Sequence, residues 1–245
     1  PTRNAGFDQE QAAVCAVRAC GDPGWADRGV TPEFQVQIGS LPHVLRRDRD
    51  NFPAHHGYLR ADTAKVAAWR ERLAALGNGI KIGISWRGGT RNTRFFSRTL
   101  ALNDLLPLFR NNRVRAVSLQ YGDCAGEIAA LQRDHGVTLC HWQHAIADHD
   151  ETAALIEALD LVISVQTTVA HLAGALGKQA WVLLPAVSEW RYMQSGDTMP
   201  WYPSVRLFRQ EKLFEWGPVV ERVNVELLAK TDQVRRGIFR PNVIL

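Results

Sequence analysis

The stretch "DLVISVQTTVAHLAGALGK", residues 160–178, decides the fold of this chain. Residues 161–165 form an apolar run, which is typical of a strand buried on both faces of a parallel sheet. Residues 168–177 have the apolar spacing of a helix that ends at a glycine. Between them, Gln166 and Thr167 lie where the strand gives way to the helix. Ligands of open α/β sheets bind at such turns, so this unit indicates both a fold and a place to look for function.

The same alternation of strand and helix continues from residue 81 onward. The predicted strands span 81–86, 115–120, 137–140, 160–165, 180–185 and 204–210. The predicted helices span 61–77, 102–109, 123–136, 150–159, 168–177 and 216–230, with Asp62 and Asp150 as N-caps of the first and fourth. Apolar strands that alternate with helices in this way predict an α/β fold with a Rossmann-like parallel sheet.

The first third of the chain is less regular. It contains one predicted helix at 8–20, a candidate strand at 34–38 and loops, which is too little for a complete α/β domain. We therefore expect an N-terminal part with a linker helix (1–78), a Rossmann-like domain (79–212), and a C-terminal helix with a tail (213–245). The chain begins Pro-Thr-Arg, without an initiator Met or a signal-peptide pattern, so we expect it to be a piece of a longer protein.

Composition excludes some classes of protein. Hydrophobic residues make up 46% of the chain, yet no stretch is long and charge-free enough to predict a membrane span. The net charge is only +4, but seven arginines and a single acid lie between residues 87 and 115. No helix-turn-helix, zinc or RNA-recognition pattern accompanies them, which disfavours nucleic acid as a partner. A solvated basic face and a site for a small phosphate-bearing ligand both remain open.

The cysteines and histidines do not indicate a metal site. The four cysteines have no CxxC spacing, and the one metal-like cluster, "CHWQHAIADH" at 140–149, fits no zinc pattern. We therefore expect no metal, and reduced thiols in a cytoplasmic protein.

Three loops at the predicted carboxyl edge of the sheet carry polar residues. In "SWRGGTRNTRFFSR" (85–98), glycines allow the backbone to approach a ligand closely, and Arg87, Arg91 and Arg94 can reach phosphate oxygens. This loop is neither a Walker loop nor a dinucleotide fingerprint. Gln120 and Asp150 lie near the same edge, where a ribose or base can be held.

The second loop is the turn at residues 166–171. Thr167 and Thr168 begin the predicted helix, whose free N–H groups suit a phosphate, and His171 lies one turn further on. A purely structural role is equally open for the threonines, as an N-cap, and it is the simpler reading of His171, as a core residue. The third loop, 184–204, contains Arg191, and its aromatic residues suit either a ligand or packing between domains.

Several motifs in order resemble glycosyltransferase family 9. They are "GISWRG" (83–88), "VSLQYG" (117–122), "ETAALIEALDLVISVQTTVAHLAGALG" (151–177), "WVLLP" (181–185), "EWRY" (189–192) and "PWYPSVRLFRQ" (200–210). The similarity covers about residues 34–230. It is strongest to the heptosyltransferase-like domain that follows tetratricopeptide repeats in bacterial proteins.

The resemblance implies a GT-B fold, in which two Rossmann-like domains face each other. Residues 80–212 would be the domain for the nucleotide diphosphate sugar, and the N-terminal part would be a remnant of the acceptor domain. Sugar transfer in the family is inverting and independent of metals and cofactors, and the acceptor here would be a hydroxyl of a glycan, lipid or protein. The implied location is the cytoplasm or the inner-membrane surface, with a tetratricopeptide-repeat region upstream.

Two departures from the family pattern leave the activity open. The family has an acid at the position of Gln166, and its general base comes from N-terminal loops that this sequence does not contain. No catalytic residue is therefore assigned, and a non-catalytic module that binds nucleotide sugars or proteins is the alternative to an enzyme. The predicted donor-binding residues are Arg87, Arg91, Arg94, Gln120, Asp150, Gln166, Thr167, Thr168, His171 and Arg191.

Overall fold

The computed structural model describes residues 3–4, 37–89 and 95–235, and these form two compact units. Residues 4–54 form one unit, and residues 1–3 with 55–245 form the other. The predicted helix 8–20 and most of the candidate strand 34–38 lie outside the described residues. The smaller unit contains η3 (Ile38–Ser40), α1 (Leu41–Leu45) and η4 (Arg49–Asn51) where the sequence suggested a loop. Pro42, near the start of α1, favours this short helix because its backbone angle is already helical.

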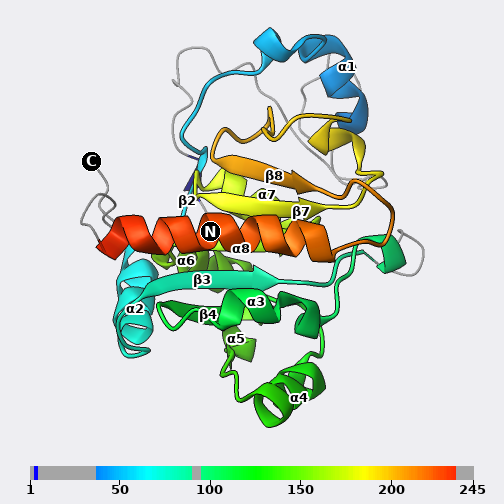
Figure 1. Cartoon of the computed structure of the whole chain (residues 1–245). Helices are drawn as coiled ribbons and strands as arrows, with labels where there is room; N and C mark the ends of the chain where they lie inside the picture. The colour runs from blue at the N-terminus through cyan, green and yellow to red at the C-terminus, as the bar shows by residue number, and fades with distance from the viewer. Residues whose placement is uncertain (1–2, 5–36, 90–94, 236–245) are drawn as a thin grey trace. The chain divides into compact units, whose positions relative to one another are not determined.

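A six-stranded parallel sheet is the centre of the larger unit (Figure 1). Its strands are β3 (Ile80–Ser85), β4 (Val114–Ser118), β5 (Cys140–His141), β6 (Leu161–Val165), β7 (Ala180–Leu184) and β8 (Val205–Arg209). Two further short strands are β1 (Arg3–Asn4) and β2 (Leu59–Arg60). The order in the sheet is β5-β4-β3-β6-β7-β8, so the predicted Rossmann-like parallel sheet is confirmed. The chain builds outward from β3 in one direction and then returns to β6 on the other side, which places the switch point between β3 and β6.

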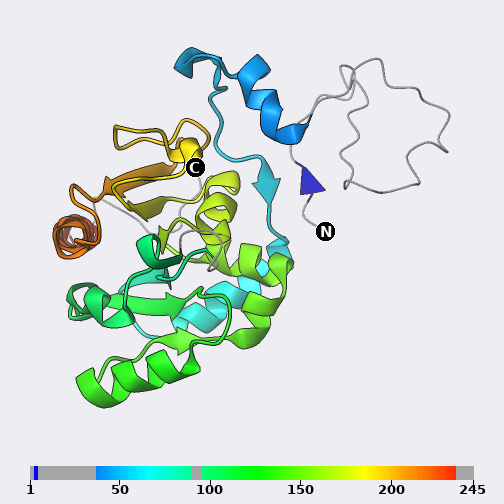
Figure 2. The same ribbon diagram turned by 90° about the vertical axis from the view of Figure 1, so that its right-hand side faces the viewer.

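Helices cover both faces of this sheet (Figures 1 and 2). One face is covered by α2 (Thr63–Ala74), α5 (Gln143–Ala147), α6 (His149–Ala158) and α7 (Thr168–Ala175). The other is covered by α3 (Leu106–Phe109), α4 (Ala125–His135) and α8 (Gly217–Arg235), which Figure 2 shows end-on. Short 3₁₀ helices lie in the connections: η6 (Phe95–Ser97), η7 (Leu102–Leu105) and η8 (Trp190–Tyr192).

Each strand divides its side chains between two apolar cores. Along β6, Ile163 and Val165 pack on the side of α8, whereas Val162 packs on the side of α6 and α7. All five residues of β6 are buried, as expected for a central strand of a doubly covered sheet. The sheet is therefore packed on both faces, and the loops that follow its strands lie at its carboxyl edge.

Of the two predicted N-caps, one is confirmed and the other is wrong. Asp62 caps α2 as predicted, because its Oδ1 accepts hydrogen bonds from the N–H groups of Ala64 and Lys65 at 2.9 and 3.0 Å. The prediction of Asp150 as the cap of α6 is wrong. Asp148 is the cap, since its Oδ1 accepts from the N–H groups of Asp150 and Glu151 at 2.8 and 3.0 Å. The helix begins at His149, one residue earlier than predicted, so Asp150 lies inside its first turn.

The unit that contains the sheet includes the chain from His55 onward, and α2 is part of its core. Val66, Trp69 and Leu73 of α2 are buried against the same face as α6, and the Trp69 indole N–H donates to Glu151 at 2.9 Å. At the other end, α8 extends to Arg235, five residues beyond the prediction. No helix among the described residues has the length and apolar character needed to cross a membrane.

Candidate ligand pocket at the carboxyl edge of the sheet

A pocket of about 800 Å³ opens at the carboxyl ends of β3, β4, β6 and β7. It lies at the switch point between β3 and β6, where open α/β sheets bind their ligands. Seven of the predicted donor-binding residues line it: Arg87, Gln120, Gln166, Thr167, Thr168, His171 and Arg191. The sheet thus brings together residues that are 104 positions apart in the sequence, from 87 to 191.

Three of the predicted residues are not among those that line the pocket. Arg91 and Arg94 lie outside the described residues. Asp150 is in the first turn of α6, whose cap Asp148 lies two residues before the predicted one, and it is not among the residues that line the pocket. The roles of the ten residues in binding a ligand stay predictions.

The turn after β6 presents the start of α7 to the pocket. Thr167 has an extended backbone and precedes the helix, but its hydroxyl pairs with Ser164 Oγ at 2.9 Å and makes no capping hydrogen bond. The first N–H groups of a helix have no intrahelical acceptor, and together with the helix dipole they attract an anion. Because the Thr167 side chain does not cap α7, a ligand can accept from these N–H groups at Thr168, which lines the pocket.

Two buried glutamines line the pocket, and they differ completely in their hydrogen bonding. Gln120, 4% exposed, holds the loop after β3: its Oε1 accepts from the N–H groups of Trp86 and Arg87 at 3.0 and 2.8 Å. Its Nε2 donates to the carbonyls of Tyr121 and Arg87 at 3.0 and 3.3 Å. Every polar position of this amide is used within the fold, so Gln120 positions the loop.

Gln166 has the opposite character. Gln166 is 1% exposed, yet among the described residues neither its Oε1 nor its Nε2 has a hydrogen-bond partner. Buried polar groups are almost always paired, because an unpaired buried amide costs about 1–3 kcal/mol. The residue lines the pocket, so we expect the missing partner on a ligand.

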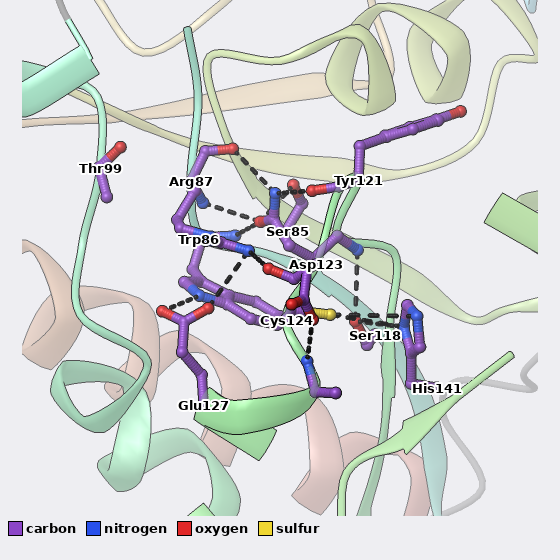
Figure 3. A network of polar contacts seen from close by, with 12 residues as sticks. Ser85, Trp86, Arg87, Thr99, Ser118, Tyr121, Asp123, Cys124, Glu127 and His141 are labelled. Carbon is purple, nitrogen blue, oxygen red and sulfur yellow. Dashed lines mark hydrogen bonds and ion pairs between the residues drawn. The ribbon is translucent and has the colours of Figure 1, made fainter. Parts of the chain in front are cut away.

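Arg87 is tied to the wall of the pocket. Its guanidinium donates to the carbonyl of Asp123 at 2.6 Å and pairs with Glu127 Oε2 at 3.2 Å (Figure 3). The indole N–H of Trp86 donates to the other oxygen of Glu127 at 3.3 Å. Two contacts therefore hold the guanidinium of Arg87 at the pocket wall.

Arg98 and Glu189 were not predicted from the sequence. Arg98, whose side chain is 12% exposed, donates to Glu189 Oε1 at 2.6 Å and to the carbonyl of Gln166 at 2.5 Å. The second oxygen of Glu189 lies 3.9 Å from Arg191, which stacks over the ring of Trp190 at 4.5 Å. One carboxylate thus serves two arginines at the pocket. Alternation of strands and helices cannot reveal this pairing, because Glu189 lies 91 positions from Arg98 in a long loop.

His171 and its aromatic neighbours form the wall beside α7. Burial lowers the pKa of His171, and the nearby charge of Arg191 lowers it further, so the imidazole is neutral near pH 7. Tyr202 lies edge-on to His171, with ring centroids 5.8 Å apart. Tyr202 also packs on Gly174, where a Cβ atom would come within 2.3 Å of the phenol ring. Trp201 packs edge-on against the half-exposed Trp190.

The histidines of the metal-like sequence cluster have separate partners. His141 bonds to Ser118 Oγ at 3.1 Å and to Gln143 Oε1 at 3.0 Å, while His144 stacks on Trp69 and His149 lies beside Tyr121. Within the ranges that the structure describes, no three His, Cys, Asp or Glu side chains are arranged to hold a metal ion. Burial raises the pKa of Cys124, which lies 3.8 Å from His141.

Comparison with solved structures gives the fold a name. ADP-heptose lps heptosyltransferase II from E. coli superposes with a TM-score of 0.52 over 76% of this chain and 59% of its own, at 15% identity. The sheet unit has a heptosyltransferase-like fold. A glycosyl transferase family 9 structure from Veillonella parvula matches 74% of this chain and 54% of its own, with a TM-score of 0.46 and 11% identity. At 15% identity, the similarity to heptosyltransferase II shows the fold alone.

Sequence comparison identifies a longer relative. Protein FlbA from Caulobacter vibrioides is 35% identical over 199 residues, which are 80% of this chain and 33% of FlbA. No model of a known protein family matches the chain. The chain therefore spans a third of the length of FlbA and 59% of the length of heptosyltransferase II.

Proposed function

We propose that this pocket binds a nucleoside diphosphate sugar and that the chain acts in transfer of the sugar to a hydroxyl group of a glycan, lipid or protein. The observation that carries the proposal is the unpaired, buried amide of Gln166 at the switch point of the sheet. A sugar has hydroxyl groups that both donate and accept, so it can satisfy the carbonyl and the amino group of Gln166 together. The pocket volume of about 800 Å³ lies in the range of cofactor-sized ligands.

The charges around the pocket suit the diphosphate. Three arginines line it, Arg87, Arg98 and Arg191, against two acids, Asp123 and Glu189. The uncapped start of α7 adds backbone donors and the positive end of a helix dipole. As the glycosidic bond breaks, negative charge develops on the departing nucleoside diphosphate, and arginines with a helix N-terminus stabilise that charge without a metal ion. This is the inverting, metal-independent chemistry that the family resemblance implies.

The second candidate is a module that binds the nucleotide sugar without transferring it. The observation that favours it is that both acids of the pocket are already engaged. Asp123 Oδ1 accepts from the N–H of Ala125 at 3.1 Å, and Glu189 pairs with Arg98 at 2.6 Å. Gln166 is neutral and cannot act as a general base. The described residues of the pocket therefore offer more groups that can bind a nucleotide sugar than groups that can take up a proton.

The test of binding is thermal stability in the presence of UDP, ADP and GDP and their sugar conjugates. A ligand at 100 times its Kd stabilises the folded state by about 2.7 kcal/mol, which corresponds to a Tm increase of about 5–10 °C for a chain of this size. We expect Arg191→Ala to reduce the shift at a given concentration. Arg133→Ala is the matched control, since Arg133 is also exposed and ion-paired but lies on α4 away from the pocket.

The outcomes separate the candidates. Absence of a shift with every nucleotide and conjugate would contradict both. A shift together with turnover of the conjugate, followed as release of the nucleoside diphosphate in the presence of an acceptor, supports the transferase. A shift without turnover by the full-length gene product supports the binding module.

A further inference from the structure

Tyr192 is a buried side chain directly behind the pocket wall, and the proposed function does not use it. Tyr192 is fully buried, at 0% exposure, and its hydroxyl oxygen lies 3.3 Å from His171 Nε2. Among the described residues, His171 Nε2 is the hydroxyl's hydrogen-bond partner, and no other is found. Burial raises the pKa of the Tyr192 phenol well above its ordinary value, so the hydroxyl keeps its proton.

This contact fixes which nitrogen of His171 carries hydrogen. A buried hydroxyl with a single partner leaves no donor unpaired only if it donates to that partner. His171 Nε2 must then be the acceptor, and in a neutral imidazole the hydrogen lies on the other nitrogen, Nδ1. Burial and the charge of Arg191 lower the pKa of His171, which keeps the ring neutral as this requires.

The Nδ1–H group has no acceptor among the residues that the structure describes, and His171 lines the pocket. The plane of the ring is held from two sides, by Tyr192 at 5.6 Å between centroids and by Tyr202 at 5.8 Å. The imidazole is therefore an oriented donor at the pocket wall, one turn into α7, beside Arg98 and Arg191.

The backbone next to Tyr192 is strained at Met193, and hydrogen bonds from Arg209 hold it in place. Met193, the next residue, has φ 59° and ψ 175°, a region that residues other than glycine rarely occupy. Arg209, at the end of β8, donates to the carbonyls of Tyr192 and Met193 and to Ser188 Oγ. Strain of this kind costs about 1–3 kcal/mol and is concentrated at ligand sites, where the position of a side chain matters more than local stability.

We infer that Tyr192 is a positioning residue: it holds His171 in the tautomer with hydrogen on Nδ1, so that this N–H donates to a phosphate oxygen of the bound nucleoside diphosphate. The ligand contact rests on the proposed function, whereas the tautomer is a property of the free protein. His171 is the residue that touches the ligand, and Tyr192 acts through it.

Two histidine variants separate the two nitrogens. The amide nitrogen of asparagine lies close to the place of Nδ1, so His171→Asn keeps the donor toward the ligand and loses the bond to Tyr192. Glutamine places its amide oxygen near Nε2, so His171→Gln keeps an acceptor for Tyr192 and loses the donor. A hydrogen bond to a charged group is worth about 1.5–3 kcal/mol, so we expect His171→Gln to weaken binding of UDP, ADP or GDP about tenfold or more. His171→Asn is expected to weaken it about threefold or less.

The tautomer itself is read from the ¹⁵N chemical shifts of histidine-labelled full-length protein without ligand. We expect the wild type to show the Nδ1–H form of His171, and Tyr192→Phe to show a mixture of the two neutral forms with nucleotide affinity reduced about threefold to tenfold. Tyr58→Phe is the matched control, because the Tyr58 hydroxyl meets Tyr202 at 3.3 Å and does not contact His171. It should leave both the spectrum and the affinity unchanged.

Each result has one meaning. An Nε2–H form in the wild type overturns the inference whatever the ligand does, and the spectrum remains readable even where a Tyr192 variant folds poorly. Equal nucleotide affinity of His171→Gln and the wild type overturns the contact with the phosphate. If the wild type shows the Nδ1–H form but binds no nucleoside diphosphate, the proposed function fails, and the ligand contact fails with it, while the role of Tyr192 in setting the tautomer stands.

Discussion

Replacing the two buried glutamines of the pocket with methionine is predicted to change the free energy of unfolding in opposite directions. Methionine is close to glutamine in size and shape and lacks the amide, so each change removes hydrogen bonding with little loss of volume. Gln120 and Gln166 are 4% and 1% exposed, so burial does not distinguish them. Hydrogen bonding does, since the amide of Gln120 is fully paired and that of Gln166 is unpaired among the described residues.

For Gln120→Met the expected effect is destabilisation. The substitution leaves the N–H groups of Trp86 and Arg87 without the acceptor that they now reach at 3.0 and 2.8 Å. Each buried donor left unpaired costs about 1–3 kcal/mol, so the loss for the two donors is about 2–6 kcal/mol. For a chain of this size that lowers the Tm by about 6 °C or more.

For Gln166→Met the expected effect on the ligand-free protein is stabilisation. The amide leaves water on folding and gains no partner among the described residues, so its removal is worth about 1–2 kcal/mol. The same variant should lose the additional stabilisation that a nucleotide sugar gives over the corresponding nucleoside diphosphate. Stability and ligand recognition are therefore expected to move in opposite directions at this position.

Urea denaturation followed by tryptophan fluorescence measures both changes, with the slope m as a check that the transition is unaltered. The reasoning is refuted if Gln166→Met destabilises the ligand-free protein by 1 kcal/mol or more, since that would mean that the amide is paired in solution. An unchanged stability of Gln120→Met would refute the assignment of Gln120 as the residue that holds the loop. Gln120→Glu serves as a comparison variant, because one oxygen of its carboxylate can still accept from the N–H groups of both Trp86 and Arg87.

Three further predictions follow from single contacts. Glu189→Gln should tighten nucleoside diphosphate binding about fivefold in calorimetry, because it removes the carboxylate that now neutralises two arginines of the pocket; weaker binding would show that the carboxylate positions those arginines. Gly174→Ala should lower stability by about 1–3 kcal/mol in denaturant titrations, because its Cβ would lie 2.3 Å from the ring of Tyr202, and a neutral result would mean that the ring has room to move. Asp148→Ala should lower the Tm more than Asp150→Ala. Backbone N–H groups lower the pKa of Asp148, so this difference should be present above the ordinary pKa of aspartate and vanish as the pH falls through the lowered value.

Much of the fold follows from local pattern in the sequence. Apart from α5, which was not predicted, the strands and helices from α2 onward begin and end within about five residues of the prediction, because apolar runs, N-capping aspartate and closing glycine act locally. Gly136, for example, has φ 68° at the end of α4, a conformation that glycine adopts without strain. The order of strands in a parallel sheet then brings the loops after them to one edge, which is why seven predicted residues meet in one pocket.

The roles of individual residues in the pocket were harder to predict from the sequence. Gln120 was predicted as a ligand contact, yet its amide is used by the backbone of Trp86 and Arg87, more than 30 positions away. Whether a polar side chain at a strand end faces the ligand or the neighbouring loop depends on the path of that loop, which periodicity does not encode. The same reason explains why Arg98 and Glu189 were missed, since their pairing joins two loops that sequence alone cannot place together.

The hydrogen bonds of the pocket also bear on whether it is built for binding or for transfer. Transfer needs a group that takes a proton from the acceptor, and each of the two carboxylates that line the pocket already accepts a hydrogen bond, Asp123 at one oxygen from the start of α4 and Glu189 from Arg98. Two groups of the pocket without a partner among the described residues are the amide of Gln166 and the Nδ1–H of a neutral His171, which recognise a ligand without ionising. Glu189 can become a free base only if a ligand phosphate displaces it from Arg98. If it does, Glu189→Gln will tighten nucleotide binding and abolish turnover together, whereas tighter binding with turnover unchanged places the base elsewhere.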